Sequence, residues 1–255
     1  MTTRFPHLAV HVFRIGMSLF AHVVALHSGR RLAAHVAAAA VFYAAFALAH
    51  DLTHGTLGLS VRARRWALAA AAQLLFVSGQ TMRILHLRHH ARPGAADDVE
   101  GVAIRLGLIG AWIRLPVLFF SMRHAAYQAA KPAARRWLIG ETVLTAIVVA
   151  TSLVWEPLRT YVVVALALQL SAPLWGGYLP HRAPEWLRSL AGRFAFTRSP
   201  TAISLAYHDL HHEHADVPCQ NLGAFALELG LKGLGMIPAP ALSTAVDSYR
   251  RRLHT

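Results

Sequence analysis

Four long apolar stretches, separated by polar and basic segments, divide the chain. They run from about Leu8 to Leu26, from Leu32 to Ala49, from Trp137 to Trp155 and from Leu158 to Tyr178. About 20 residues of α-helix cross the hydrocarbon core of a bilayer, so each stretch is a candidate membrane-spanning helix. The first is the weakest candidate because two histidines, a serine and an arginine interrupt it, and a tilted or partly interfacial helix is the alternative.

Two shorter apolar runs lie at residues 66–79 and 104–120, the second broken by Arg114 and Pro116. Neither suits a full crossing, and we expect both to lie in the membrane interface. The pattern therefore predicts an all-α membrane protein with about four transmembrane helices in two hairpins and additional interfacial helices. We expect residues 1–255 to form a single domain.

Composition agrees with a membrane protein. Of the 255 residues, 55% are hydrophobic and only 15% are charged, and the mean hydropathy of +0.41 exceeds that of most soluble domains. The single cysteine, Cys219, excludes an intramolecular disulfide. Basic residues and histidines interrupt the N-terminal 20 residues where a cleavable signal would be apolar, so we expect a retained first helix.

The distribution of basic residues predicts the orientation. Cytoplasmic loops of membrane proteins carry an excess of Lys and Arg. If both termini are cytoplasmic, the two outer loops hold only Arg30, Arg31 and Arg159, and nearly all other basic residues fall on the cytoplasmic face. We therefore expect an integral protein of a bacterial-type inner membrane. Its net charge of +13 suits anionic lipid head groups, and nucleic-acid binding is not expected, since no aromatic-basic binding module is evident.

Three histidine clusters fall on this predicted cytoplasmic side. They are HDLTH at 50–54, HLRHH at 86–90 and HDLHHEH at 208–214, and a further histidine follows the last span in YLPHR at 178–182. Helical positions i, i+3 and i+4 share one face, so each cluster can direct its imidazoles toward one point. Neutral imidazole is a common ligand of iron, zinc and copper. One tetrahedral ion needs fewer ligands than the nine candidates, so the sequence predicts two metal ions. The candidate ligands are His50, His54, His86, His89, His90, His181, His208, His211 and His212.

The other histidines and the nearby carboxylates have more than one interpretation. We expect seven histidines to be ordinary solvated or hydrogen-bonded side chains: His7, His11, His22, His27, His35, His124 and His254. Carboxylates commonly orient a ligand histidine through its other ring nitrogen, and we expect this role for Asp51 and Asp209, which lie inside the boxes. Asp97 and Asp98 either do the same or cap a turn. Asn221 is expected to be a turn residue rather than a group that reaches a metal-bound water.

The order of the boxes HDLTHG, HLRHH and HDLHH, with paired spans between the second and third, resembles the membrane fatty-acid desaturase superfamily. The resemblance covers about Ala49 to Leu222. It implies a four-span fold capped by a cytoplasmic histidine-rich di-iron layer, in which the nine histidines bind two Fe2+ ions that activate O2. It also implies electron delivery by an external donor such as a ferredoxin.

Several details are similar to bacterial β-carotene ketolases. These are HHARPGAADD after the second box, YLPHR after the last span and HHEHADVP at 211–218. By this resemblance His214 is a hydrogen-bond donor close to the metals, while an ordinary exposed histidine is the alternative. Ala215 replaces a proline of the ketolases, and CQNL at 219–222 replaces an aromatic pair. An acyl-lipid desaturase or hydroxylase is therefore the alternative to a carotenoid ketolase or oxygenase.

The expected substrate is a long apolar lipid that enters between the spans from the bilayer. The small side chains of residues 33–50 either leave room for such a channel or allow close helix packing. Two other classes remain. A membrane zinc hydrolase is remote, because HDLTH has Asp where the zinc-protease signature H-E-x-x-H has Glu. A metal transporter would place its ligands at mid-membrane rather than at the helix ends.

Overall fold

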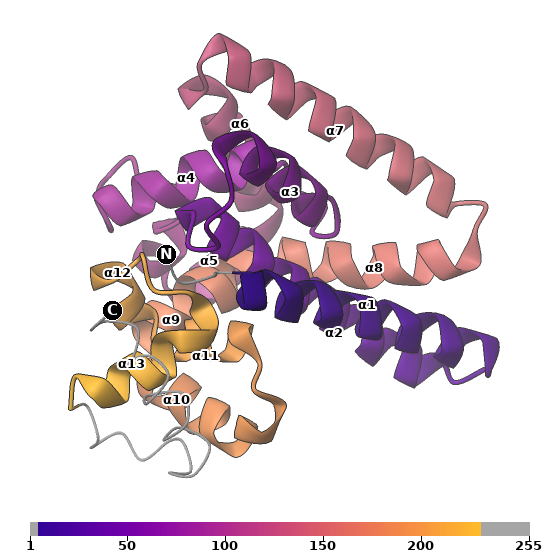
Figure 1. Cartoon of the computed structure of the whole chain (residues 1–255). Helices are drawn as coiled ribbons and strands as arrows, with labels where there is room; N and C mark the ends of the chain where they lie inside the picture. Colours follow the sequence, from indigo (N-terminus) through magenta and orange to yellow (C-terminus); the bar gives the residue numbers. More distant parts are fainter. Residues whose placement is uncertain (1–4, 231–255) are drawn as a thin grey trace.

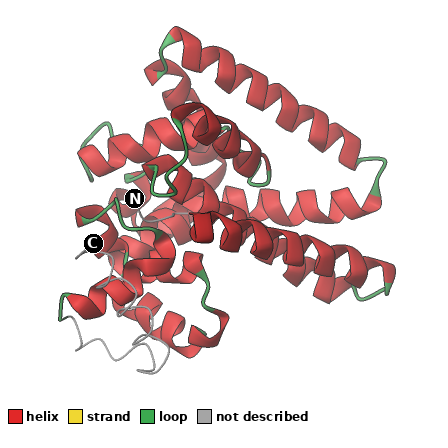
Figure 2. Cartoon of the chain, viewed as in Figure 1, coloured by secondary structure: helices red, strands yellow, loops and turns green. Residues whose placement is uncertain are grey.

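The computed structural model describes residues 5–230, and within them every regular element is a helix (Figure 2). The helices in chain order (Figure 1) are α1 (Phe5–His27), α2 (Arg31–His54), α3 (Val61–Gln73), α4 (Gly79–Ala91), α5 (Val102–Ile113), α6 (Leu115–Ala129), α7 (Pro132–Ser152), α8 (Glu156–Leu170), the π-helix η1 (Pro173–Tyr178), α9 (Leu179–Arg182), α10 (Pro184–Arg193), the 3-10 helix η2 (Ala195–Thr197), α11 (Pro200–Ala206), α12 (His208–Glu213), the 3-10 helix η3 (Cys219–Asn221) and α13 (Leu222–Glu228).

Helix α2 forms the centre of the main core. Its small side chains Ala38, Ala45 and Ala49 are completely buried, and α1 lies along it as an antiparallel hairpin (Figure 1). α3, α4, α8 and α11 also contact α2. The alanine-rich stretch therefore serves close packing along much of its length, which small residues permit between helices.

The polar side chains of α1 that interrupt its apolar pattern have partners. His22 contacts the carbonyl oxygens of Ala34 and Pro157 at 2.9 and 3.1 Å. Arg14 donates to two carbonyl oxygens near η2, at 3.0 and 2.8 Å. Paired polar groups cost far less to bury than unpaired ones. The stretch consequently forms one continuous helix rather than a broken one.

Among the described residues, two helices are long and apolar enough to cross a membrane, His7–His27 and Arg31–His54. A third crossing is possible if α8 and the segment Pro173–Arg182, which meet at an angle of 43°, act as one bent span. α7 forms where the third span was predicted but does not qualify, because Arg135, Arg136 and Glu141 fall within every 18-residue stretch of it. The predicted arrangement of four spans is therefore not confirmed.

The bend in the α8 segment positions aromatic groups against α2. η1 is a π-helix, a form that often occurs at functional sites. It turns Trp175 toward Tyr43 and Phe46, with ring centroids 5.3 and 5.0 Å apart. The Trp175 indole donates to the carbonyl oxygen of Leu168 at 2.9 Å.

The two short apolar runs lie in short helices and the turns that follow or join them. The first run ends α3 and turns at Phe76, which has a positive φ of 52°. The second run covers α5 and α6, and α5 is kinked at Gly107, where φ is 70°. Neither run forms a helix long enough to cross a membrane, as the sequence predicts. The short helices α9 to α13 close the end of the bundle at which α2 and α4 terminate (Figure 1).

Candidate metal centre

The histidine boxes occupy helix ends that meet at one end of the bundle. His50 and His54 lie in the last turns of α2, and the second box ends α4. The third box is α12, and His181 comes from the short helix α9. Each box spans about one helical turn, so its imidazoles share one face. The structure thus brings together the nine histidines selected from the sequence, while their role as ligands stays a prediction.

The first group consists of His50, His54, His86 and His211. One ligand nitrogen of each lies within 4.8 Å of all the others. The Nε2 atoms of His86 and His50 are 3.1 Å apart, and those of His211 and His54 are 3.2 Å apart. Three elements, α2, α4 and α12, therefore contribute to one convergent set of imidazoles.

The second group consists of His89, His181, His208 and His212, which also lie within 4.8 Å of one another. Their Nε2 atoms form a chain, with 3.2 Å from His89 to His181, 3.1 Å from His181 to His208 and 3.1 Å from His208 to His212. Because α4 and α12 contribute to both groups, the two groups are adjacent.

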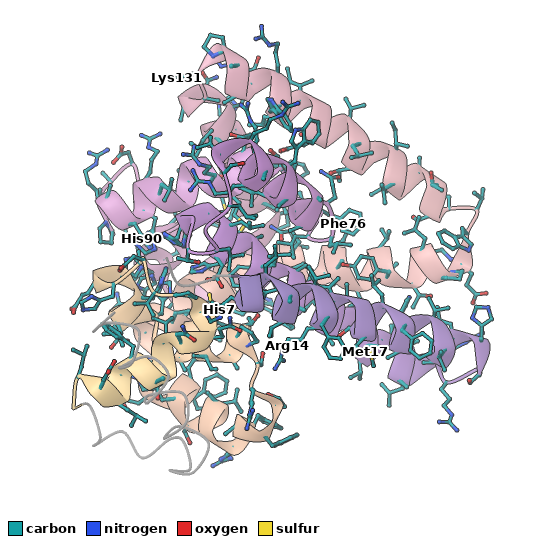
Figure 3. The ribbon with its side chains drawn as sticks, in the orientation of Figure 1. His7, Arg14, Met17, Phe76, His90 and Lys131 are labelled. Carbon is teal, nitrogen blue, oxygen red and sulfur yellow. The ribbon has the colours of Figure 1, made fainter. Side chains whose placement is uncertain are left out.

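His90 lies between the two groups, near the end of α4 (Figure 3). Its ring stacks on His212 of the second group with centroids 4.2 Å apart, and it lies 4.6 Å from the ring of His54 in the first group. Its Nε2 is buried and has no hydrogen-bond partner within the described part of the chain. An unpaired buried nitrogen is costly, so His90 is suited to complete a metal site.

Both groups fit metal ions better than hydrogen bonds between imidazoles. Two nitrogens about 2.0–2.1 Å from one ion, at about 90–110°, are roughly 2.9–3.4 Å apart, and the Nε2 pairs are 3.1–3.2 Å apart. A neutral imidazole carries one N–H, so at most two of the three contacts in the second group can be hydrogen bonds. A cation at each centre would use all the lone pairs.

Burial keeps several of these imidazoles neutral, as metal binding requires. Burial and then the neighbouring His54 and His86 lower the pKa of His211 to about 2. Burial, followed by His89 and His181, lowers the pKa of His212 to about 3. Burial likewise lowers the pKa of His90 and His208 below the usual range. The site therefore offers lone pairs rather than positive charges at neutral pH.

Two acidic side chains after the second box contact predicted ligand histidines. Asp98 contacts Nδ1 of His89 at 2.8 Å and Glu100 contacts Nδ1 of His86 at 3.0 Å. Burial opposes ionisation of Asp98, but hydrogen bonds from the Gly94 amide, His89 and the Gly101 amide outweigh it and lower its pKa. Asp98 thus fulfils both roles considered for it, since it orients a histidine and fixes the turn. Glu100 was not identified from the sequence.

Asp51 lies beside the first group, since one ligand atom each of His50, Asp51 and Cys219 lie within 4.8 Å of one another. Its Oδ1 accepts from the Cys219 amide at 2.9 Å, and its Oδ2 lies 3.0 Å from Nε2 of His11. The Cys219 sulfur lies 3.2 Å from Nδ1 of His50. All four side chains are buried. Burial raises the pKa of Cys219, which keeps it a thiol. His11 is therefore hydrogen-bonded, and it belongs to a buried chain that ends at a predicted ligand.

The placement of Asp209 differs from the prediction. Its carboxylate pairs with Arg188 and its side chain is 58% exposed, because the first turn of α12 directs it away from the imidazoles and toward α10. Arg188 also pairs with Glu185 at 2.9 Å. Asp209 therefore links α12 to α10, and its expected role in orienting a ligand histidine stays a prediction.

The remaining candidates lie outside both groups. Asp97 is about half exposed and pairs with Arg88 and Arg92. The ring of His214 packs against Phe225 with centroids 4.8 Å apart. Asn221 ends the 3-10 turn η3, as expected of a turn residue. His254 lies outside the described residues. Four other histidines that were not predicted to be ligands also lie apart from the two groups: His7, His27, His35 and His124.

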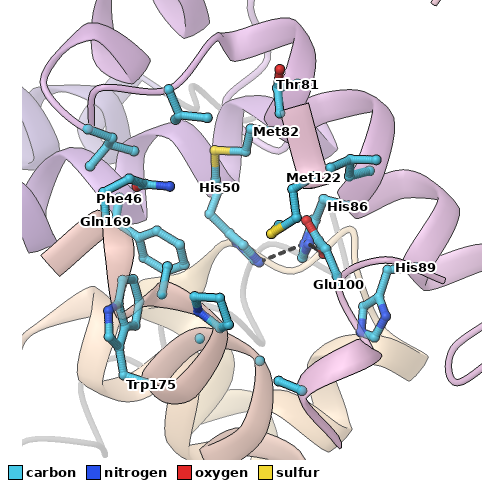
Figure 4. A pocket seen from close by; sticks show the side chains of 18 of the residues that line it. Phe46, His50, Thr81, Met82, His86, His89, Glu100, Met122, Gln169 and Trp175 are labelled. Atoms are coloured by element: carbon cyan, nitrogen blue, oxygen red, sulfur yellow. Dashed lines mark hydrogen bonds and ion pairs between the residues drawn. The ribbon is translucent and has the colours of Figure 1, made fainter. Parts of the chain in front are cut away.

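A largely apolar pocket of about 120 Å³ lies against His50, His86, His89 and His208 (Figure 4). Phe46 from α2, Met82 from α4, Met122 from α6 and Trp175 from η1 are among its apolar walls, and the figure shows these side chains around the contact between His50 and His86. Its polar walls include Thr81, Gln169 and Glu100. Such a pocket suits an apolar group brought close to metal-bound chemistry.

The described residues form a helical protein with candidate membrane spans. It has two groups of four histidines, each of which could hold a metal ion, and an apolar pocket beside them. A family model described as Fatty acid desaturase matches residues 30–232. The chain belongs to this family. No curated protein and no solved structure matches the chain.

Proposed function

We propose that the protein is a non-haem di-iron, O2-dependent oxidoreductase that acts on a long apolar lipid in the membrane. The observation that carries the proposal is the pair of four-histidine groups beside an apolar pocket in a chain of the desaturase family. Imidazole-rich sets without thiolates suit iron as well as zinc or copper, and family membership favours iron.

Two bound Fe2+ ions would supply O2 activation and C–H oxidation, with electrons from an external donor such as a ferredoxin. The side chains of the protein position the metal ligands and the substrate and exclude water. Asp98 and Glu100 keep the Nδ1 protons of His89 and His86 in place, so that Nε2 of each ring faces the centre. Phe46 and Trp175 wall the pocket with aromatic surface, which excludes water and holds the lipid carbon.

The proposed substrate is a carotenoid, with β-carotene ketolation or another monooxygenase reaction as the reaction type. The support is the resemblance of HHARPGAADD, YLPHR and HHEHADVP to bacterial ketolases. An acyl-lipid desaturase or hydroxylase is the second candidate, and the family match favours it. With two electrons from the donor and two protons per O2, hydroxylation transfers one oxygen atom to carbon and releases the other as water. Ketolation takes two such hydroxylations at one carbon, followed by loss of one water. Desaturation uses the same two electrons and two protons, removes two hydrogens from the lipid and releases both oxygen atoms as water.

Expression in two hosts separates these substrates. We expect a new keto-carotenoid in a host that accumulates β-carotene, and unchanged acyl unsaturation in a host whose membrane fatty acids are profiled. The reverse result would contradict the ketolase proposal and leave the di-iron proposal intact.

Metal analysis of the purified protein tests the di-iron proposal itself. We expect about two irons per chain, since two separate four-nitrogen groups are present. One tightly bound zinc would instead support the hydrolase, and weak, exchangeable metal would support a transport protein.

A single-ligand variant sharpens that analysis. His89→Ala should abolish activity and lower the iron content to about one ion per chain, because it removes a nitrogen from the second group. His27→Ala is the matched control, since His27 is exposed and contacts only the carbonyl oxygen of Val23 in its own helix. Equal damage from the two variants would show that the division between box and background histidines is wrong.

We also propose that both termini and the histidine groups face the cytoplasm of a bacterial-type cell. The support is the excess of Lys and Arg outside the two loops that hold Arg30, Arg31 and Arg159. Single cysteines introduced at Arg30 and at Arg92 in a Cys219→Ser background should react with an impermeant thiol reagent from opposite sides of sealed vesicles.

A further inference from the structure

Four arginines surround a second pocket, near the start of α3 and distinct from the histidine pocket. The pocket has a volume of about 680 Å³, and its walls include Arg62, Arg64, Arg65 and Arg83. No carboxylate lies among its wall residues. Within residues 5–230 the arginine ion pairs are made by Arg88, Arg92 and Arg188 instead. The positive charge of this pocket is therefore uncompensated by the described part of the protein.

This cationic pocket continues into a groove between α3 and α7. The groove has a volume of about 660 Å³ and shares Arg65, Trp66 and Trp137 with the pocket. Beyond these shared residues its walls include the small or apolar side chains Ala69, Ala70, Gly140 and Leu144. Three polar side chains also line it: Gln73, Arg136 and Glu141, whose carboxylate bonds to Ser78. A positively charged pocket thus adjoins a groove whose walls are mainly small and apolar.

Two indoles mark the junction between the compartments. The rings of Trp66 and Trp137 pack edge to face with centroids 4.6 Å apart, and the Arg65 guanidinium lies 4.5 Å from the centre of the Trp137 ring. Indoles favour the boundary between lipid head groups and hydrocarbon, and an arginine held over an aromatic ring is pre-organised for an anion. The order of charge, indole and apolar groove matches the order of phosphate, glycerol and acyl chain in a lipid.

We propose that the pocket and groove together bind one anionic phospholipid, with its phosphate among the arginines and one acyl chain between α3 and α7. A folded acidic protein would meet the arginines but would not fill the apolar groove. The inference does not depend on the metals, so its failure leaves the proposed oxidoreductase untouched.

Quenching of tryptophan fluorescence by brominated lipids tests the proposal on the full chain in detergent. Brominated phosphatidylglycerol should quench at a roughly fivefold lower concentration than brominated phosphatidylcholine, because each phosphate-contacting arginine favours the anionic lipid. Each signal is normalised to the unbrominated lipid. Trp66→Phe/Trp137→Phe should remove the saturable part of the quenching, since the bromines would lie beside these indoles.

Two charge variants provide the matched comparison. Arg62→Gln/Arg65→Gln/Arg83→Gln should abolish the preference for phosphatidylglycerol. Arg30→Gln/Arg31→Gln/Arg159→Gln removes the same charge from exposed residues at the far turns of the molecule (Figure 1) and should preserve it. Equal quenching by the two lipids, or an unchanged preference in the first variant, would overturn the proposal. So would displacement of the lipid by millimolar inorganic phosphate, which would indicate a site for the free anion.

Discussion

The predicted ligand histidines differ in what holds the ring nitrogen that faces away from the metal centre. His86 and His89 each have a carboxylate at Nδ1, whereas His50 has the Cys219 thiol. A carboxylate that accepts the Nδ1 proton makes the imidazole a stronger electron-pair donor to a metal. A thiol sulfur is a weak hydrogen-bond acceptor and has a smaller effect. His50 is therefore expected to bind a metal less strongly than His86, and the buried chain through Cys219 and Asp51 positions it.

Neighbouring aspartates after the second box give a direct test of these contacts. Asp98→Asn should lower metal affinity or activity by about 10–100-fold, because it removes the carboxylate that orients His89. Asp97→Asn should have little effect, since its ion pairs with Arg88 and Arg92 are exposed. Competition with a chelator measures the affinities. A similar loss in both variants would mean that the loop, rather than the bond to His89, matters.

The thiol contact makes a separate prediction. Cys219→Ala should weaken metal binding by roughly 10-fold or more, because His50 Nδ1 loses its partner in a buried site. Cys219→Ser keeps a hydroxyl that can accept from His50 and donate to Asp51, and should bind metal more tightly than the alanine variant. Chelator competition on protein with unchanged thermal unfolding separates positioning from misfolding, and equal affinities of the two variants would contradict the positioning role.

Helices were predictable to different degrees. The α1–α2 hairpin follows from apolar length alone, and the box histidines follow from their spacing on helix faces. The π-helix η1 was not predicted, because no propensity distinguishes its six residues from the end of a span. α7 was expected to be an apolar span, but its Glu141 is only 6% exposed and bonds to Ser78. The two residues are 63 positions apart, so a local sequence pattern does not reveal this contact.

The same limit explains the missed and misplaced acidic residues. Asp209 lies inside a histidine box, but its direction depends on where α10 brings Arg188. Glu100 lies 14 residues from His86, and only the turn between α4 and α5 returns it to that histidine. Spacing within one helix is a local property, whereas contacts across a turn depend on the fold.

The bend at η1 predicts a role for Trp175 in selecting the substrate. Trp175 and Leu205 line both the histidine pocket and a larger pocket of about 790 Å³ between α1, α2, α10 and α11. Trp175→Ala should connect the two pockets and change the position or chain length oxidised, as product chromatography would show. Trp186→Ala is the control, because Trp186 lines only the larger pocket. An unchanged product pattern for Trp175→Ala would exclude a dividing role.

Across the whole molecule, the fold gathers nitrogen ligands from four separate segments into a largely buried space. Apolar helices bring α2, α4, α9 and α12 to one end, and burial then opposes protonation of imidazoles there, among them His211 and His212. Without metal, the close grouping of these imidazoles makes the folded state sensitive to acid. The packing that prepares the site for cations thus couples stability to pH.

The metal-free protein should lose stability as pH falls below about 6.5, the unperturbed pKa of histidine. The pKa values of His211 and His212 are lowered to about 2 and about 3 in the fold. The unfolded chain therefore binds protons first, and the stabilisation present above pH 6.5 declines continuously toward these lower values. Thermal unfolding of chelator-treated protein between pH 7.5 and 4.5 measures the decline, which His211→Gln/His212→Gln should reduce and the exposed His27→Gln should not. A flat profile for the unsubstituted protein would mean that these imidazoles are not held neutral by burial.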